Sequence, residues 1–147
     1  MTKNRKMLAM VMIAAVVVAI IFFMARKLWT PRPVIWEEGT QILSIDYFDT
    51  ASGDCISIEE YNQEAILNIL EGLSETWTIS KSDGIRYGAD DVLLYMAVAH
   101  DNEVKSICFE QKKAYSTEGR GEHHYRILDS ERAFQALQAE LDLDLTN

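Results

Sequence analysis

The polar stretch GEHHYR, residues 121–126, holds the residue types that come closest to a metal site in this sequence. Side chains alternate between the two faces of a strand, so His123 and His124 point to opposite faces. Glu122, His124 and Arg126 then lie in one row. A zinc site needs three or four converging ligands, and this row offers two. The stretch therefore indicates an exposed polar strand face, with a small-ligand or metal site near Glu122 and His124 as the alternative.

Cys55 is the candidate nucleophile, because it follows Asp54 in the turn-like stretch SGDC. A catalytic cysteine needs a base, which His123 or His124 could supply. A hydrolase nucleophile, however, lies on a sharp strand–turn–helix connection, and SGDC lacks the G-x-S-x-G pattern of that connection. The stretch is more typical of a turn before a helix.

Other chemical signatures are missing from the sequence. The adjacent acidic pairs at 59–60 and 90–91 are chain neighbours and do not form a pair positioned across a cleft. The sequence has no phosphate-binding glycine loop, no zincin helix and no dinucleotide fingerprint. It therefore favours a non-enzymatic protein and predicts no catalytic residue, cofactor or metal, although an enzyme without a linear motif stays open.

The two cysteines, Cys55 and Cys108, allow one disulfide. Closing a loop of that length would stabilise the fold by about 4 kcal/mol in the chain-entropy model. The alternative is two separate buried thiols, which behave as small apolar residues. The sequence contains no C-x-x-C pair of the kind that binds a metal.

Tyrosines on the later strands are the candidates for a contact surface. If Tyr115 and Tyr125 face each other across a hairpin, they form an aromatic patch of the kind that interfaces favour. Glu122, His124 and Arg126 would extend this possible binding surface. The alternative is that the tyrosines belong to the core.

These residues need elements to position them, and the first two elements are well marked. Residues 41–48, QILSIDYF, alternate as a strand does, with Leu43, Ile45 and Tyr47 on one face. A helix is expected over about 58–71, since Ser57 and Glu60 have the spacing of a capping box and Gly72 marks the end.

The remaining pattern predicts a sheet and a second helix. Strands are expected over 75–80, 92–99, 104–110 and 122–128, and the stretch KKAYST either continues the strand before it or restarts one. A helix capped by Asp129 or Ser130 follows, with Phe134, Leu137 and Leu141 as its buried stripe. The fold class is α+β, an antiparallel sheet of four to five strands packed by two helices in the order β-α-β-β-β-β-α.

One long apolar segment precedes this domain. Residues 7–25 are nineteen consecutive residues without a charge, and a helix of that length spans about 28 Å, close to the thickness of a bilayer core. Ten of them favour membrane insertion by about 3–6 kcal/mol in total. A cleaved signal peptide would have a shorter apolar region and a small-x-small site, whereas this segment ends in FFMARK. A soluble core helix would show a polar stripe. A retained transmembrane anchor over 7–27 is therefore expected, in contact with the lipid bilayer.

The charges on either side of the span set the expected orientation. Lys3, Arg5, Lys6 and the amino terminus precede it, and fewer cations follow it closely. The positive-inside rule therefore favours, by a narrow margin, a cytoplasmic N-terminus and an outer C-terminal domain. The expected organisation is a cytoplasmic tail over 1–6, the anchor over 7–27, a linker over 28–40 and an extracytoplasmic domain over 41–147.

The outer part of the chain is strongly acidic. All 23 acidic residues and nine of the 14 basic residues lie beyond the span, so residues 28–147 carry a formal charge of −14. Such a surface repels nucleic acid, so the sequence predicts that the protein does not bind DNA or RNA. The charge fits a soluble, self-repelling surface, or a basic partner.

A cationic start, a long span and a small acidic α+β domain resemble the small single-pass membrane-anchored proteins of unknown function found in Gram-positive bacteria. The resemblance is one of layout, with a weak echo in SIEEYNQEAILNILEGL, and no functional residue carries over. The first hypothesis is a membrane-tethered, non-enzymatic module that binds a protein, such as an envelope complex or a toxin it neutralises. The alternatives are a small-ligand or metal-binding sensor or scavenger domain and an envelope enzyme without a motif.

Overall fold

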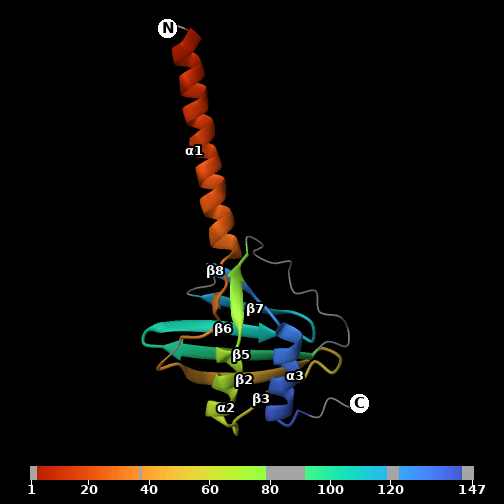
Figure 1. The fold of residues 1–147 in the computed structure, drawn as a ribbon. Helices are drawn as coiled ribbons and strands as arrows, with labels where there is room; N and C mark the ends of the chain where they lie inside the picture. Colours follow the sequence, from red (N-terminus) through yellow and green to blue (C-terminus); the bar gives the residue numbers. More distant parts are fainter. Residues whose placement is uncertain (1–2, 37, 79–91, 119–122, 144–147) are drawn as a thin grey trace. The chain divides into compact units, whose positions relative to one another are not determined.

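The computed structural model describes residues 3–36, 38–78, 92–118 and 123–143. The chain forms two compact units, Met1–Thr30 and Pro31–Asn147. The first unit is one helix, and the second is an α+β domain (Figure 1). Each unit is described separately.

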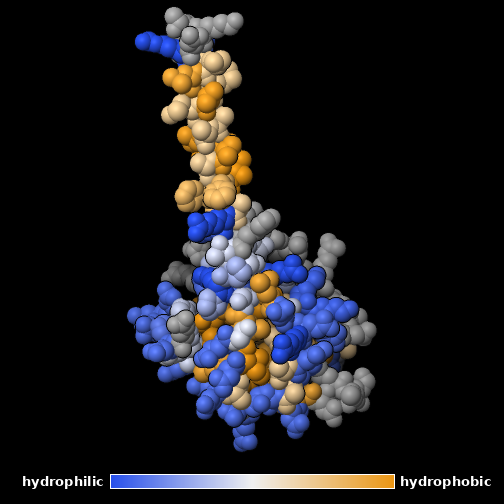
Figure 2. Space-filling model, in the orientation of Figure 1, coloured by the Kyte–Doolittle hydropathy of each residue, from blue (hydrophilic) through white to orange (hydrophobic). Residues whose placement is uncertain are grey.

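The first unit is helix α1, Lys3–Trp29, which no glycine or proline interrupts. Its large apolar side chains from Met7 to Met24 are 48–72% exposed, and its surface is almost continuously hydrophobic in Figure 2. The segment Arg5–Lys27 is the one helix among the described residues that is long and apolar enough to cross a membrane. Arg26 and Lys27 lie in the last turn, where positive charges interact favourably with the helix dipole. The expected span is thus a continuous helix.

The second unit is built on one antiparallel sheet of eight strands in the order β1-β4-β8-β7-β6-β5-β2-β3. The strands are β1 Arg32–Pro33, β2 Gln41–Asp49, β3 Cys55–Ser57, β4 Ser74–Trp77, β5 Val92–His100, β6 Glu103–Phe109, β7 Ala114–Glu118 and β8 His123–Ile127. Two helices, α2 Gln63–Glu71 and α3 Ser130–Glu140, complete the unit. The α+β class and the antiparallel sheet are confirmed.

The number of strands is larger than the four to five expected. The edge strands β1 and β3 contain two and three residues, too few to show an alternating pattern in a sequence. The stretch KKAYST forms a separate strand, β7, because Glu110 and Lys113 close a tight turn after β6. These three strands account for the difference.

Both helices cover the same face of the sheet, which we call the inner face (Figure 1). On β5, Leu94, Met96 and Val98 point to this face and are 0–2% exposed. They pack with Phe109 on β6 and with the buried stripes of the helices. The stripe of α2 contains Ile66 and Leu70, and that of α3 contains Ala133, Phe134 and Leu137. Alternation along the strands and helical spacing meet here, which is why this half of the inner face is apolar.

A β-bulge in β2 changes the expected facing of one residue. The pairing with β5 shifts between Ile42 and Ser44, so one extra residue is inserted. Ile42 and Ile45 are consequently both buried, and Leu43 is 55% exposed. The expectation that Leu43 shares a face with Ile45 was wrong, because strict alternation fails at a bulge.

Helix α2 begins later than expected. Asn62 is its N-cap, and the Asn62 side-chain oxygen accepts a hydrogen bond of 3.2 Å from the Ala65 amide. Ser57 lies instead in β3, where its hydroxyl donates to Asp46. The capping box was wrong because pairing with β2 draws the residues around Ser57 into the sheet. The expected end of the helix at Gly72 is confirmed.

Helix α3 begins after Asp129, as expected, although the Asp129 side chain makes no capping hydrogen bond. Asp129 has a φ of +54°, and the Ser130 hydroxyl donates to the Lys112 carbonyl 3.1 Å away. The expected stripe is confirmed for Phe134 and Leu137, which are buried. Leu141 is partly buried against the same core.

Most of the segment expected to be a linker, from Pro31 onward, belongs to the domain. Residues 32–36, which we call the strap, pair with β4 through Arg32 and Pro33 and then cross the inner face. Val34 is fully buried, Ile35 is 4% exposed, and the Val34 amide donates to the Leu73 carbonyl at 3.2 Å. The domain therefore begins about ten residues before the expected boundary at 41.

Candidate functional site

The residues singled out in the sequence do not form a single surface. Tyr115 pairs with Arg126, and Ser116 pairs with Tyr125, so the two tyrosines point to opposite faces of the sheet. Tyr115, His124 and Arg126 share the outer face, whereas Tyr125 is 9% exposed on the inner face. The aromatic patch of Tyr115 and Tyr125 was wrong, because it required these residues to be direct cross-strand neighbours.

Glu122, the acidic member of the candidate ligand pair with His124, lies outside the described residues. Across the described ranges, no three His, Cys, Asp or Glu side chains converge as metal ligands would. His124 pairs with Thr117 and points to the outer face, whereas Glu118, the next residue of β7, points to the inner face.

The two cysteines are free thiols in the structure. Cys55 lies on β3 and Cys108 on β6, and the strands β2 and β5 separate them. Strands lie about 4.8 Å apart, so three spacings exceed the roughly 7 Å that a disulfide can bridge between Cα atoms. The possible disulfide between Cys55 and Cys108 is not compatible with this strand order. Burial raises the pKa of the Cys108 thiol to about 11, opposed by a hydrogen bond with Tyr95, so Cys108 is a structural thiol.

A buried charge network lies on the inner face beneath the strap, and no part of it was predicted. Glu75 on β4 is 0% exposed and Lys105 on β6 is 2% exposed, and their charged atoms lie 2.8 Å apart. Ser116 on β7 donates its hydroxyl to the second oxygen of Glu75. A buried carboxylate is costly unless it is paired, and here every oxygen of Glu75 accepts a hydrogen bond.

Lys105 uses all three of its ammonium protons. They point to Glu75 Oε1, to Glu118 Oε1 at 2.9 Å and to the Val34 carbonyl of the strap at 2.6 Å. All of these acceptors are buried or partly buried, and one of them is a backbone carbonyl of the strap. Lys105 therefore ties the strap to the two carboxylates.

Arg32 closes the network from the strap side. Its Nε donates to Glu75 at 2.8 Å, and its Nη2 contacts both Glu75 and Glu118. Its guanidinium also stacks 3.7 Å from the centroid of the Tyr125 ring, a cation–π contact. Tyr125 thus belongs to the floor of this network.

The pKa values in the network follow from burial and pairing. Burial alone would raise the pKa of Glu118, but hydrogen bonds and charge from Lys105 and Arg32 outweigh burial and lower it. Burial likewise opposes the charged form of Arg32, yet Glu75 and Glu118 raise the pKa of its guanidinium. For Tyr125, burial raises the pKa of the phenol, opposed by Arg32. Glu118 and Arg32 are therefore both ionised at neutral pH.

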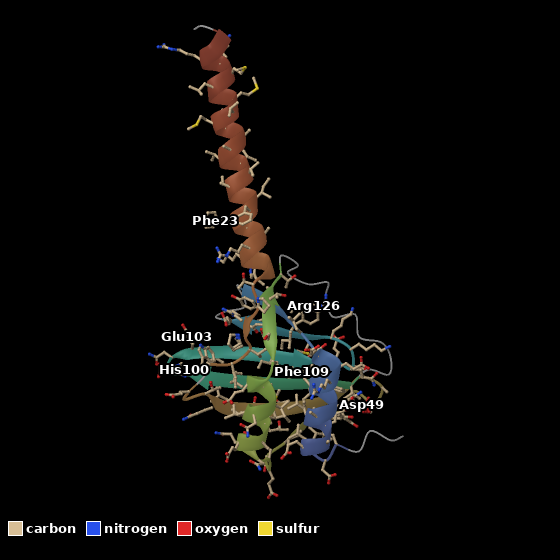
Figure 3. The ribbon with its side chains drawn as sticks, viewed as in Figure 1. Phe23, Asp49, His100, Glu103, Phe109 and Arg126 are labelled. Carbon is tan, nitrogen blue, oxygen red and sulfur yellow. The ribbon has the colours of Figure 1, made fainter. Side chains whose placement is uncertain are left out.

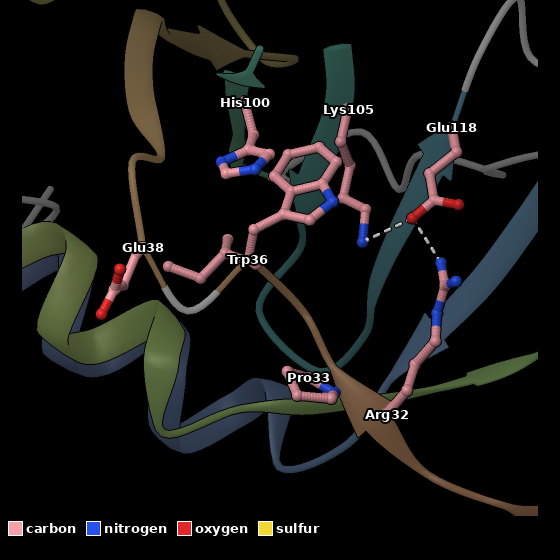
Figure 4. Close-up of a pocket in the computed structure, with 8 residues that line it drawn as sticks. Arg32, Pro33, Trp36, Glu38, His100, Lys105 and Glu118 are labelled. Carbon is pink, nitrogen blue, oxygen red and sulfur yellow. Dashed lines mark hydrogen bonds and ion pairs between the residues drawn. The ribbon is translucent and has the colours of Figure 1, made fainter. Parts of the chain in front are cut away.

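A pocket of about 440 Å³ opens beside the network (Figure 4). It is lined by residues of the strap, by Glu38 and by residues of strands β5, β6 and β7. They are Arg32, Pro33, Ile35, Trp36, Glu38, His100, Lys105 and Glu118. The volume lies within the range of small-ligand sites, and apolar rings line it together with charged groups.

Trp36 and His100 form one side of this pocket. Their rings are stacked, with centroids 5.4 Å apart and planes at 17°. His100 ends β5 at the hairpin with Glu103, at one end of the sheet (Figure 3). Gly39 lies against this imidazole and has a φ of +74°, a backbone conformation that favours glycine. The His100 Nδ1 atom is buried without a hydrogen-bond partner among the described residues.

The sequence contained one signal for this site that was not used. Lys105 alternates with Ile107 and Phe109, so strand periodicity already places the ammonium on the buried face. A lysine at such a position requires a buried carboxylate. Nothing in the sequence identified Glu75 or Glu118 as that partner, because 30 residues separate Glu75 from Lys105.

The fold and the site define an α+β domain with a charged inner-face network, preceded by one helix that could span a membrane. Comparisons with protein-family models, with curated proteins and with solved structures found no match for this chain.

Proposed function

We propose that this protein is a single-pass, membrane-tethered, non-enzymatic binding module whose acidic domain lies outside the cytoplasm and binds a protein. The observation that carries the tether is the exposure of α1. Its large apolar side chains from Met7 to Met24 are about half to three-quarters exposed. Such a helix is unfavourable in water and favourable in lipid, since exposing apolar surface to water costs about 25 cal/mol for each Å².

The short chain between the anchor and the domain supports a role close to the membrane. Helix α1 ends at Trp29 and the strap begins at Arg32, so two residues connect them. The strap itself is held by buried contacts and does not act as a flexible spacer. A domain tethered in this way meets partners at the membrane surface at a raised effective concentration.

The chemistry of the lysine and the two cysteines described above supports binding over catalysis. Lys105 has no free donor, Cys108 has a raised pKa, and Cys55 lies on the far edge strand. The pocket presents aromatic rings beside charges, the composition of a recognition site. The strongly negative domain favours a basic protein as the partner.

Three measurements test this function together. In intact cells, external protease should digest the domain, and the mature polypeptide should still begin before residue 25. Crosslinking in the same cells should capture a protein partner. A mature chain beginning after residue 25, or a domain that protease spares, would contradict the tether. Recovery of no crosslinked protein would contradict the binding role.

A second function is favoured by one observation, the 440 Å³ pocket itself. A sensor or scavenger domain for a small ligand would use such a cavity without a protein partner. Thermal stabilisation of the purified full chain by a small molecule, with no crosslinked protein in cells, would favour this second function.

A further inference from the structure

The geometry points to the strap pocket as a receptor for a basic side chain, a lysine or arginine of the partner protein. The strap pocket is the cavity lined by Arg32, Trp36, Glu38, His100, Lys105 and Glu118. This inference rests on the proposed binding function and names the chemistry that its partner would present.

The first step is to ask which charges in the pocket are available. Lys105 has no free donor, and Arg32 engages Glu75 and Glu118 through Nε and Nη2. An anionic ligand would meet two cations whose charge is already balanced by two carboxylates. The two cations of the pocket are therefore already neutralised.

The acceptors, in contrast, are not all used. Glu38 is exposed, and within the described ranges it has no hydrogen bond or ion pair. Counting Glu75 behind the wall, three carboxylates face two cations, an excess of one negative charge. The neighbouring Asp101 and Glu103 are acidic too. The local charge therefore has the same sign as the domain and attracts a cation.

The aromatic wall fits the body of a basic side chain. Figure 4 shows Trp36 between Glu38 on one rim and Glu118 on the other. Lysine and arginine bury their aliphatic stems along apolar surface while the charged head seeks a carboxylate. Indole rings also attract cations, and Lys105 already lies 5.5 Å from the Trp36 centroid. A stem on Trp36 and Ile35, with its head at Glu38, satisfies both preferences.

The experiment uses the full chain in nanodiscs of phosphatidylcholine, a lipid without net charge. The probe is the peptide acetyl-Gly-Lys-Gly-amide, and the readout is the indole N–H resonance of Trp36, assigned with Trp36→Phe. We expect this resonance to shift to saturation with the lysine peptide. The same peptide with norleucine for lysine keeps the stem without the charge, and it should bind at least about tenfold more weakly, since a hydrogen bond to a charged group is lost.

A matched pair of variants identifies the acceptor. Glu38→Gln removes one charge from the rim and should weaken the lysine peptide about tenfold, because Glu38 would be the direct partner. Glu60→Gln removes the same charge from an exposed position outside the pocket and should change binding less than twofold. Glu38 is exposed, so both variants keep the fold.

Several results would overturn the inference. One is that the norleucine peptide, or the same peptide with glutamate for lysine, binds as tightly as the lysine peptide. Another is that Glu38→Gln and Glu60→Gln weaken binding equally, which would indicate diffuse attraction to the acidic surface. Tighter binding of free butylamine than of the peptide would assign the pocket to a small amine and not to a protein side chain. If cells yield a crosslinked partner equally with Glu38→Gln, the inference fails while the binding function stands. If no partner is crosslinked at all, the binding function fails.

Discussion

The inner face of the sheet is filled in two different ways, although strand β6 contributes Phe109 to one half and Lys105 to the other. Beneath α2 and α3 it is apolar, with Leu94 and Phe109 fully buried. Beneath the strap it is charged, with Glu75 and Lys105 as deeply buried as the apolar residues. The apolar half needs only shape and volume, whereas the charged half needs particular partners at particular atoms.

The difference explains how a short segment is held in one position. Two residues of β1 supply few backbone hydrogen bonds, and Pro33 has no amide proton to donate. The strap is held instead by Lys105, which donates to its Val34 carbonyl, and by Arg32, which pairs with Glu75 and Glu118. A shift of the strap along the sheet would be costly, because it would leave one of the buried charges without its partner. The charged half therefore specifies the position of the strap.

The largest effect is expected in the apolar half. Phe109→Ala removes a fully buried ring and leaves a cavity, which should lower the free energy of unfolding by about 3–5 kcal/mol. Urea titration of the full chain in neutral detergent, followed by tryptophan fluorescence, measures this change. Val104→Ala on the same strand is the control, because Val104 is 45% exposed and its truncation should cost less than about 1 kcal/mol.

A somewhat smaller loss is expected when the charged half is broken. Lys105→Met keeps the volume but leaves Glu75 short of a cation, which should cost about 3 kcal/mol in the same titration. Adding Glu75→Gln to this variant removes the uncompensated charge and should recover part of the loss. If Lys105→Met alone were as stable as the natural chain, the pairing of Glu75 with Lys105 would not contribute to stability.

Arg32→Gln should have a weaker effect than Lys105→Met. The Arg32 side chain is 41% exposed, and Glu75 and Glu118 both keep Lys105 as a partner. We expect a loss of about 1 kcal/mol, the size of a partly exposed ion pair. A loss equal to that of Lys105→Met would make the strap cation as important as the buried one.

The smallest effect is a dependence on acid that only the charged half should show. The pKa of Glu118 is lowered in the folded state, so the unfolded chain binds more protons near pH 4.5 and below. The stability that Glu118 contributes is complete above its usual pKa of 4.5 and is lost as the pH falls through the lowered pKa. Urea midpoints between pH 6 and pH 3 should therefore fall less steeply in Glu118→Gln than in the natural chain. Glu60→Gln should keep the full slope, and equal slopes in all three chains would contradict the assignment.

Much of the fold could be predicted because the signals were local. The apolar run over 92–99, the strand alternation over 104–110 and the helical stripe of Phe134 and Leu137 all depend on neighbours within a few residues. The predictions failed where a distant strand competed with a local motif. Ser57 had the spacing of a helix cap, yet pairing with β2 placed it in a strand, and the bulge in β2 exposed Leu43.

By itself the sequence determined one apolar helix, an acidic α+β domain and the order of its longer elements, because each is written in contiguous residues. Only the tertiary structure decided that the strap belongs to the domain and that a charge network lies under it. Arg32 meets Glu75 and Glu118 across 43 and 86 residues of chain. Charged residues in a sequence resemble surface residues, and their burial becomes visible only when the folded sheet brings opposite charges together.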